Sequence, residues 1–190
     1  MQNNQIKLPT HVKTPSINKD SMDGEGPFKA TVEIQNNLGF PGEKVENWHQ
    51  VAIDKMSETK SKYRSVQVFL DSCMKCGACT DKCHYFLGTS DPKNMPVARQ
   101  DLFRSVYRRH FTFAGKYFPK LVGAKDLDED MLDDWYNYFH QCSQCRRCAV
   151  FCPSGIDTSE ISMAAREVMN VIGVGQKYTC LLYTSPSPRD

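Results

Sequence analysis

Eight cysteines in two tight groups are the residues of this sequence best suited to chemistry. Both groups have the spacing C-x2-C-x2-C-x3-C, and residues 84–141 lie between them. In a reducing compartment, thiols clustered in this way are typical of metal ligands rather than of disulfides. The first group contains Cys73, Cys76, Cys79 and Cys83, and the second contains Cys142, Cys145, Cys148 and Cys152.

The spacing is that of the bacterial ferredoxin run that binds [4Fe–4S] clusters. A loop with two-residue gaps can wrap three thiolates around one cubane, while the fourth thiolate must approach from another direction. In two-cluster ferredoxins the last cysteine of each run therefore ligates the other cluster. We thus expect two clusters, one held by Cys73, Cys76, Cys79 and Cys152, the other by Cys142, Cys145, Cys148 and Cys83.

Zinc is the competing metal, because it also accepts four thiolates in tetrahedral geometry. Zinc sites typically use separated C-x2-C pairs, so the third cysteine of each run would be surplus. The repeated spacing favours iron–sulfur clusters and leaves zinc as the alternative.

The two runs differ in the residues that follow them and in the residues between their cysteines. His84 follows the first run, whereas Pro153 follows the second. The histidine either hydrogen-bonds near a cluster sulfur and raises its potential, or is a tolerated residue at a partly exposed position. Arg146 and Arg147 lie inside the second run, where positive charge stabilises the reduced cluster and raises its potential.

Composition fits a protein of the cytosol. The chain has 190 residues, a formal net charge of +2, 40% hydrophobic residues and 24% charged residues, as ordinary soluble domains do. The near-neutral balance argues against a general nucleic-acid binder. No stretch approaches the ~18 apolar residues of a membrane span, and the polar start predicts no secretory signal.

The region before the first run is predicted to be mixed. Residues 1–26 are polar and resemble a flexible arm. Within a small region over 27–66, alternation predicts a strand over 28–34, and helical spacing predicts an amphipathic helix over 44–56. Val66, Val68 and Leu70 alternate like a second strand that leads into the first cysteine run.

The remaining elements are predicted to be helices, which makes residues 67–179 a mainly α domain. One helix begins near Pro96 and reaches about His110, and a second runs from near Asp126 into Cys142. A third follows Pro153 behind an Asp157 cap. Each run is thus followed by a cap or proline signal and a helix, which predicts two duplicated halves.

Basic residues dominate the segment over 97–125, where Asp101 is the single acid. They form either solvated helix faces or a docking surface for an acidic redox partner or an anionic membrane surface. The seven are Arg99, Arg104, Arg108, Arg109, Lys116, Lys120 and Lys125.

Residues 180–190, CLLYTSPSPRD, resemble the translation of a sequencing adapter, and we exclude them from the fold. On this hypothesis Cys180 is not a ligand, and the natural protein continues beyond Thr179.

The paired runs around a helical spacer resemble the α-helical ferredoxin domain of heterodisulfide reductases, succinate dehydrogenase and anaerobic glycerol-3-phosphate dehydrogenase. Within that superfamily, residues 60–179 are most similar to the heterodisulfide-reductase-like K subunit of the DsrMKJOP membrane complex of sulfur metabolism. The stretches that carry this likeness are CGAC (76–79), DPKNMPV (91–97), RSVYRRHF (104–111) and CRRCAVFCPSGID (145–157).

The resemblance implies an electron relay on the cytoplasmic face of the membrane. Electrons would pass between a cytochrome b-type membrane subunit and a catalytic cluster that acts on a disulfide or trisulfide of a sulfur-carrier protein. The family places that cluster in domains with adjacent cysteine pairs, which this sequence lacks, so no catalytic residue is expected here. Two alternatives stay open: the iron–sulfur subunit of a glycerol-3-phosphate or glycolate dehydrogenase, and a zinc-stabilised interaction module.

Overall fold

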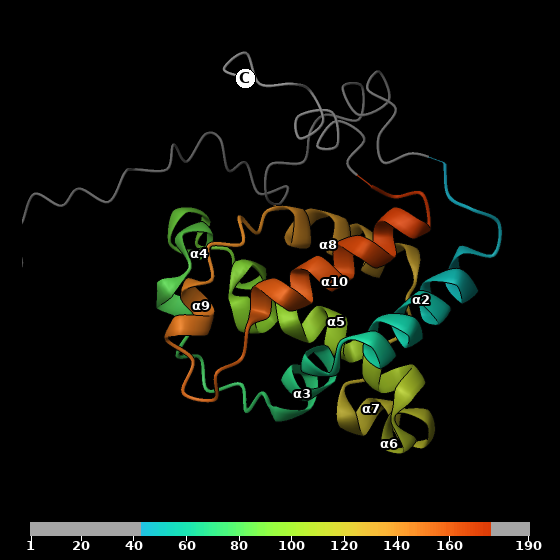
Figure 1. Ribbon diagram of the computed structural model, residues 1–190, viewed down its shortest axis with the longest axis horizontal. Helices are drawn as coiled ribbons and strands as arrows, with labels where there is room; N and C mark the ends of the chain where they lie inside the picture. The colour runs from blue at the N-terminus through green and yellow to red at the C-terminus, as the bar shows by residue number, and fades with distance from the viewer. Residues whose placement is uncertain (1–42, 176–190) are drawn as a thin grey trace, which may run out of the picture.

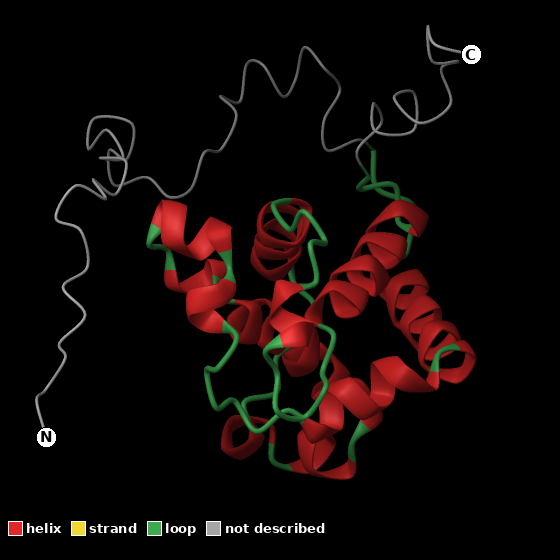
Figure 2. Ribbon diagram, turned by 60° about the vertical axis from the view of Figure 1, so that its left-hand side comes forward, coloured by secondary structure: helices red, strands yellow, loops and turns green. Residues whose placement is uncertain are grey.

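The computed structural model describes residues 43–175, and all regular structure in this part is helical (Figure 2). This confirms the predicted mainly α class. Within these residues no helix is both long and apolar enough to cross a membrane. The helices are α2 (Trp48–Lys62), α3 (Arg64–Ser72), α4 (His84–Thr89), α5 (Pro96–Phe111), α6 (Phe113–Tyr117), α7 (Pro119–Val122), α8 (Glu129–His140), α9 (Arg147–Val150) and α10 (Thr158–Val171), with short 3₁₀ turns η2 (Thr80–Lys82) and η3 (Pro92–Asn94).

Helix α10 runs through the centre and packs against α2, α5 and α8 (Figure 1). Its inward face is fully buried at Ile161, Ala165 and Val168. Between α5 and α8, the ring of Trp135 stacks on that of Phe103 with centroids 5.0 Å apart. This core lies beside the cysteine loops, so it gives them a rigid support.

The three helices predicted after residue 90 are confirmed, with small shifts at their ends. Helix α5 begins at Pro96, where the missing N–H costs no hydrogen bond. Helix α8 begins at Glu129 rather than near Asp126, because Asp128 accepts a 2.8 Å hydrogen bond from the backbone N–H of Met131 and caps the helix. Asp157 caps α10 in the same way, through the N–H of Ser159.

The strand predicted through residues 66–70 is wrong, since these residues belong to helix α3. Val66 and Leu70 are four residues apart and share the buried face of the helix, while Val68 is 55% exposed on the other side. Alternation over so short a segment fits both periods, and only burial distinguishes them.

The helix predicted over 44–56 is confirmed as α2, although it begins at Trp48 and continues to Lys62. The predicted arm over 1–26, the strand over 28–34 and the tail over 180–190 lie outside the described residues. The predicted domain boundaries therefore stay predictions.

Candidate metal centre

The two cysteine loops have the same backbone conformation. In the first loop Lys75 and Gly77 have positive φ, of 55° and 79°. In the second loop Gln144 and Arg146, at the same places relative to the cysteines, have φ of 57° and 58°. Two left-handed residues around the second cysteine turn each loop back on itself, so the duplication predicted from spacing extends to the backbone.

Hydrogen bonds repeat in the same register. The carbonyl of Gly77 accepts from the N–H of Thr80 at 2.9 Å, and that of Arg146 accepts from Ala149 at 3.0 Å. At the end of each run, the backbone N–H of the fourth cysteine donates a hydrogen bond. Cys83 donates to the carbonyl of Thr80 at 3.3 Å, and Cys152 donates to the carbonyl of Ala149 at 3.2 Å. Each loop therefore ends in a short turn that leads into its last cysteine.

A cavity of about 70 Å³ joins the first loop to the end of the second run. One water needs roughly 10–15 Å³ of such space, so the cavity accommodates a group much larger than a single atom. A lining that contains five cysteines suits the donor chemistry of an iron–sulfur cubane, and the residues present therefore fit such a cluster. The cysteines that line the cavity are Cys73, Cys76, Cys79, Cys148 and Cys152.

The fourth cysteine of the first run lies toward the second run. Helix α4, which Cys83 caps, and helix α9 of the second run lie side by side at the left edge of Figure 1. Next to Cys83, the Nδ1 atom of His84 is 3.9 Å from the Sγ atom of Cys145, and its Nε2 atom is 3.3 Å from the hydroxyl of Ser143. The imidazole, for which the sequence left two interpretations open, is thus beside a cysteine of the other run.

Burial disfavours ionisation of two of the thiols. It raises the pKa of Cys148 to about 11, with the neighbouring Cys142 and Asp157 adding to the effect. Burial also raises the pKa of Cys79. These thiols are protonated at neutral pH in the metal-free protein, so metal binding releases protons from them. All eight cysteines of the described part are free, and Cys83 is the most deeply buried of them.

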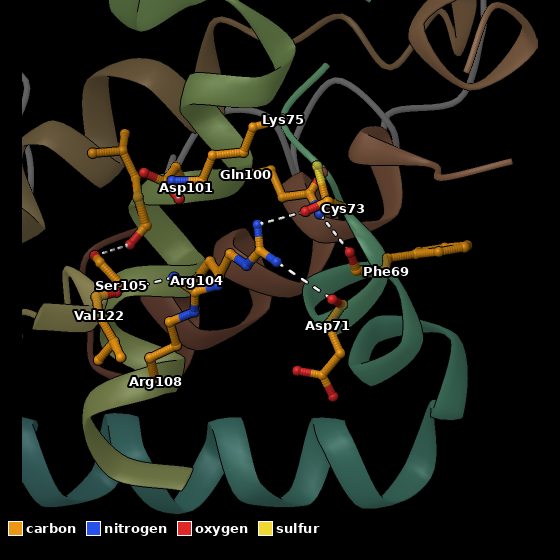
Figure 3. Close-up of polar contacts among 11 residues, drawn as sticks. Phe69, Asp71, Cys73, Lys75, Gln100, Asp101, Arg104, Ser105, Arg108 and Val122 are labelled. Carbon is orange, nitrogen blue, oxygen red and sulfur yellow. Dashed lines mark hydrogen bonds and ion pairs between the residues drawn. The ribbon is translucent and has the colours of Figure 1, made fainter. Parts of the chain in front are cut away.

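Two arginines bind backbone carbonyls at the start of the two cysteine loops. Arg104 of α5 donates to the carbonyls of Cys73 at 3.0 Å and Asp71 at 3.4 Å (Figure 3). Arg166 of α10 donates to the carbonyl of Phe139 at 2.6 Å and to that of Cys142. Each run thus has the carbonyl of its first cysteine held by an arginine from the long helix that follows the run.

The sequence predictions did not include this role, although the sequence contains a signal for it. Arg104 and Arg166 each lie eight residues after the first residue of their helix, α5 or α10. The equal offset follows from the duplicated pattern of run, turn and helix. It distinguishes these two arginines from ordinary basic surface residues.

The solvated-face interpretation of the basic segment is wrong for much of its length. Arg99 and Arg104 are buried, at 2% and 4% exposure. Arg108 donates to the carbonyl of Val122 at 3.0 Å, and Arg109 forms a 2.8 Å ion pair with Asp126. The arginines of this segment are structural. Lys116 and Lys120 remain exposed.

Comparison with known proteins finds a family that matches part of this chain. Residues 69–156 match the family described as the 4Fe-4S dicluster domain. The match covers both cysteine runs and the helices between them. No solved structure matches significantly.

The similar proteins belong to heterodisulfide-reductase-like enzymes. The chain is 52% identical over 136 residues to the Hdr-like menaquinol oxidoreductase iron-sulfur subunit of Archaeoglobus profundus, covering 72% of this chain and 24% of the relative. It is 53% identical over 133 residues to the Hdr-like menaquinol oxidoreductase iron-sulfur subunit 2 of Archaeoglobus fulgidus, covering 70% and 24%. It is 28% identical over 106 residues to one subunit of the dihydromethanophenazine:CoB–CoM heterodisulfide reductase of Methanosarcina mazei, covering 56% and 25%.

These findings confirm an iron–sulfur electron-transfer module similar to subunits of heterodisulfide-reductase-like oxidoreductases. The chain spans about a quarter of the length of the curated relatives it matches. The finer resemblance to the K subunit stays a prediction, as do the ligand set and the substrate.

Proposed function

We propose that this chain holds two [4Fe–4S] clusters and passes single electrons between them. The observation that carries the proposal is the cavity that the first loop shares with the second run, because Cys148 and Cys152 line it together with three cysteines of the first run. Of these two, the ferredoxin exchange rule assigns Cys152 to the first cluster. The proposed ligands are Cys73, Cys76, Cys79 and Cys152 for the first cluster, and Cys142, Cys145, Cys148 and Cys83 for the second.

When bound, each cluster supplies a one-electron couple. The protein contributes position and environment. Arg104 and Arg166 fix the carbonyls at the start of the two loops, so the sulfurs keep their places when the charge changes. The left-handed residues Gly77 and Arg146 turn the backbone of the two loops in the same way. Because each run gives one cysteine to the other cluster, the two clusters are neighbours and electrons can pass within the domain.

The larger protein is proposed to be the K subunit of the Dsr complex or a close relative. In that role the domain relays electrons between a membrane cytochrome b-type subunit and a catalytic cluster that acts on a sulfur-carrier protein's disulfide or trisulfide. It would lie on the cytoplasmic face of the membrane, held there by partner subunits. Support comes from the relatives, which are named as subunits of heterodisulfide-reductase-like oxidoreductases.

An exposed apolar patch on α6 and α7 is the proposed contact with the cytochrome b-type subunit. Phe113, Phe118 and Leu121 are each more than 60% exposed, and Lys116 and Lys120 lie among them. These short helices pack mainly on α5 and on each other, at the lower right of Figure 1. Exposed apolar patches of this kind mark interaction sites.

Co-expression with the cytochrome b-type subunit tests this contact. Replacing Phe113 and Phe118 with serine removes two exposed rings, and we expect the two subunits to stop co-purifying while iron content stays constant. Val68→Ser, which changes an exposed valine on α3, is the matched control and should leave co-purification intact. Unchanged co-purification of the double variant would reject the patch.

Iron and sulfide analysis after anaerobic reconstitution tests the cluster proposal directly. Two cubanes give about eight iron and eight sulfide per chain. Cys83→Ser and Cys152→Ser should each lose one cluster, with different EPR spectra for the survivors, whereas Cys180→Ser should lose none. A colourless protein that binds two zinc ions would instead establish the interaction-module alternative.

A further inference from the structure

Helix α5 presents different side chains to the two halves of the candidate centre. Gln100 lines the cavity of the first loop, where its amide donates to the carbonyl of Phe69 at 2.6 Å. The preceding residue, Arg99, instead contacts Cys83, whose sulfur is the proposed fourth ligand of the second cluster. One turn of α5 therefore places a neutral amide on one side and a cation on the other.

The Arg99 guanidinium is buried beside that sulfur. The residue is 2% exposed, and its Nη2 atom lies 3.9 Å from the Sγ atom of Cys83. The same Nη2 atom donates to the side-chain oxygen of Asn94 at 3.0 Å, and Asn94 in turn donates to Thr89 at 3.1 Å. No carboxylate within residues 43–175 forms an ion pair with Arg99, so its charge faces the sulfur without being offset.

The duplicated halves supply an internal comparison. Arg104 and Arg166 occupy equivalent places and make equivalent contacts, which aligns α5 with α10 residue by residue. In that alignment Arg99, the fourth residue of α5, corresponds to Ile161, the fourth residue of α10. The cation is thus present in one half and replaced by an apolar side chain in the other.

The other cations near the loops are matched between the two halves or exposed to solvent. Arg104 and Arg166 hold the equivalent carbonyl in each half, and Arg147 of the second loop is exposed. Lys75, which lines the first cavity, forms a 2.7 Å ion pair with Asp101. Arg146 in the second loop lies 3.3 Å from Asp157. Both Lys75 and Arg146 are also substantially exposed, so solvent screens them. Arg99 is the buried charge that distinguishes the two sides.

We infer that Arg99 raises the reduction potential of the cluster that Cys83 ligates, so that this cluster is the electron-accepting one of the pair. The inference rests on the proposed function. Reduction adds one negative charge to the cluster, and a cation beside a ligand in a poorly solvated site favours that state. Arg99 acts through Cys83 and is a positioning residue rather than a catalytic one.

Redox titration of the reconstituted protein, followed by EPR, tests this inference. The Cys83→Ser and Cys152→Ser variants assign the two midpoints to the two clusters. In Arg99→Gln, poised at the wild-type midpoint of the second cluster, we expect the ratio of reduced to oxidised cluster to fall about tenfold, which is 59 mV for a one-electron couple. The midpoint of the first cluster should stay the same.

Three further variants separate charge from structure. Asn94→Asp loses the hydrogen bond to Thr89 but keeps the size of the side chain and the acceptor for Arg99, whose charge it neutralises, so it should lower the same midpoint even if Arg99→Gln folds poorly. Arg99→Lys keeps the charge and should keep most of the potential. Arg109→Gln removes an equal charge from the exposed side of α5 and should change neither midpoint.

The outcomes distinguish this inference from the proposed function. A wild-type chain that binds no iron rejects the proposed function. If Arg99→Gln and Asn94→Asp keep their full iron content and both midpoints are unchanged, the role of Arg99 is rejected and the proposed function still stands. A fall of the second midpoint in Arg109→Gln as large as in Arg99→Gln would also reject it, because the effect would then be one of overall charge.

Discussion

Gly77 and Arg146 occupy the same left-handed position in the two loops, yet only one of them is glycine. A left-handed conformation costs an L-residue roughly 1–2 kcal/mol, and glycine avoids that cost. The second loop tolerates Arg146 there, with its guanidinium beside Asp157. The backbone turn is therefore required by the cysteines, while the residue that makes it can vary.

Gly77→Ala is expected to destabilise the protein by roughly 1 kcal/mol. The added Cβ would meet its nearest neighbour, the hydroxyl of Thr80, at an ordinary 3.8 Å, so the backbone angle is the cause rather than a collision. Denaturant unfolding of the anaerobic protein measures the change. Gly88→Ala, at an open helical position of α4, is the control and should cost nothing. Equal losses in both variants would contradict the argument.

His110 gives a pH dependence whose direction follows from its surroundings. Burial lowers the pKa of His110, and this outweighs the opposite effect of Asp126, whose carboxylate lies 3.8 Å away. The unfolded chain, with an ordinary histidine pKa near 6.5, then binds more protons than the folded chain as the pH falls through that value. Stability should therefore decrease on acidification from about pH 7.5 to about pH 6.

The His110→Gln variant isolates this contribution. We expect its free energy of unfolding to depend less steeply on pH than that of the wild type over the same interval. The comparison is made by denaturant titration at several pH values. A steeper dependence in the variant would mean that Asp126 dominates and that the sign is reversed.

At the scale of elements, the junction between α5 and α6 depends on a close backbone approach. A Cβ on Gly115 would lie 1.8 Å from the carbonyl oxygen of Arg108, which is far inside contact distance. We expect Gly115→Ala to cost roughly 3 kcal/mol, the upper end of overpacking effects. Thermal unfolding measures the loss.

The same substitution should displace α6 and α7, which carry the proposed docking patch. Ala114→Gly changes the neighbouring exposed residue without this collision and serves as the control. If Gly115→Ala unfolds like the wild type and still co-purifies with the cytochrome b-type subunit, the junction is more adaptable than its geometry indicates.

Element boundaries that depend on local chemistry were predictable from the sequence, and those that depend on packing were not. Pro96 and Asp157 mark the starts of α5 and α10 because proline and capping side chains act within a few residues. Helix α3 was mistaken for a strand because the apolar spacing of residues 66–70 suits either period. The burial of Arg99 and Arg104 depends on carbonyls and sulfurs far along the chain, which no local pattern reveals.

At the scale of the whole molecule, the proposed exchange of cysteines couples the two halves. The core between α5, α8 and α10 contains Trp135, Phe103 and Phe139, whose rings pack on one another. The loops instead gain their order from arginine contacts and from the proposed clusters. Removing a cluster should therefore loosen loops and leave the helical core folded.

Cys152→Ser makes this coupling measurable by hydrogen exchange. Because Cys152 is proposed to ligate the first cluster, its loss should increase exchange over residues 73–83, as well as around residue 152 itself. Far-UV circular dichroism should keep most of its helical signal, since α10 and its neighbours pack without the loops. Cys83→Ser is the reciprocal variant and should increase exchange over residues 142–152. If each variant loosened its own run alone, each run would bind its own cluster, and the two halves would not share their ligands.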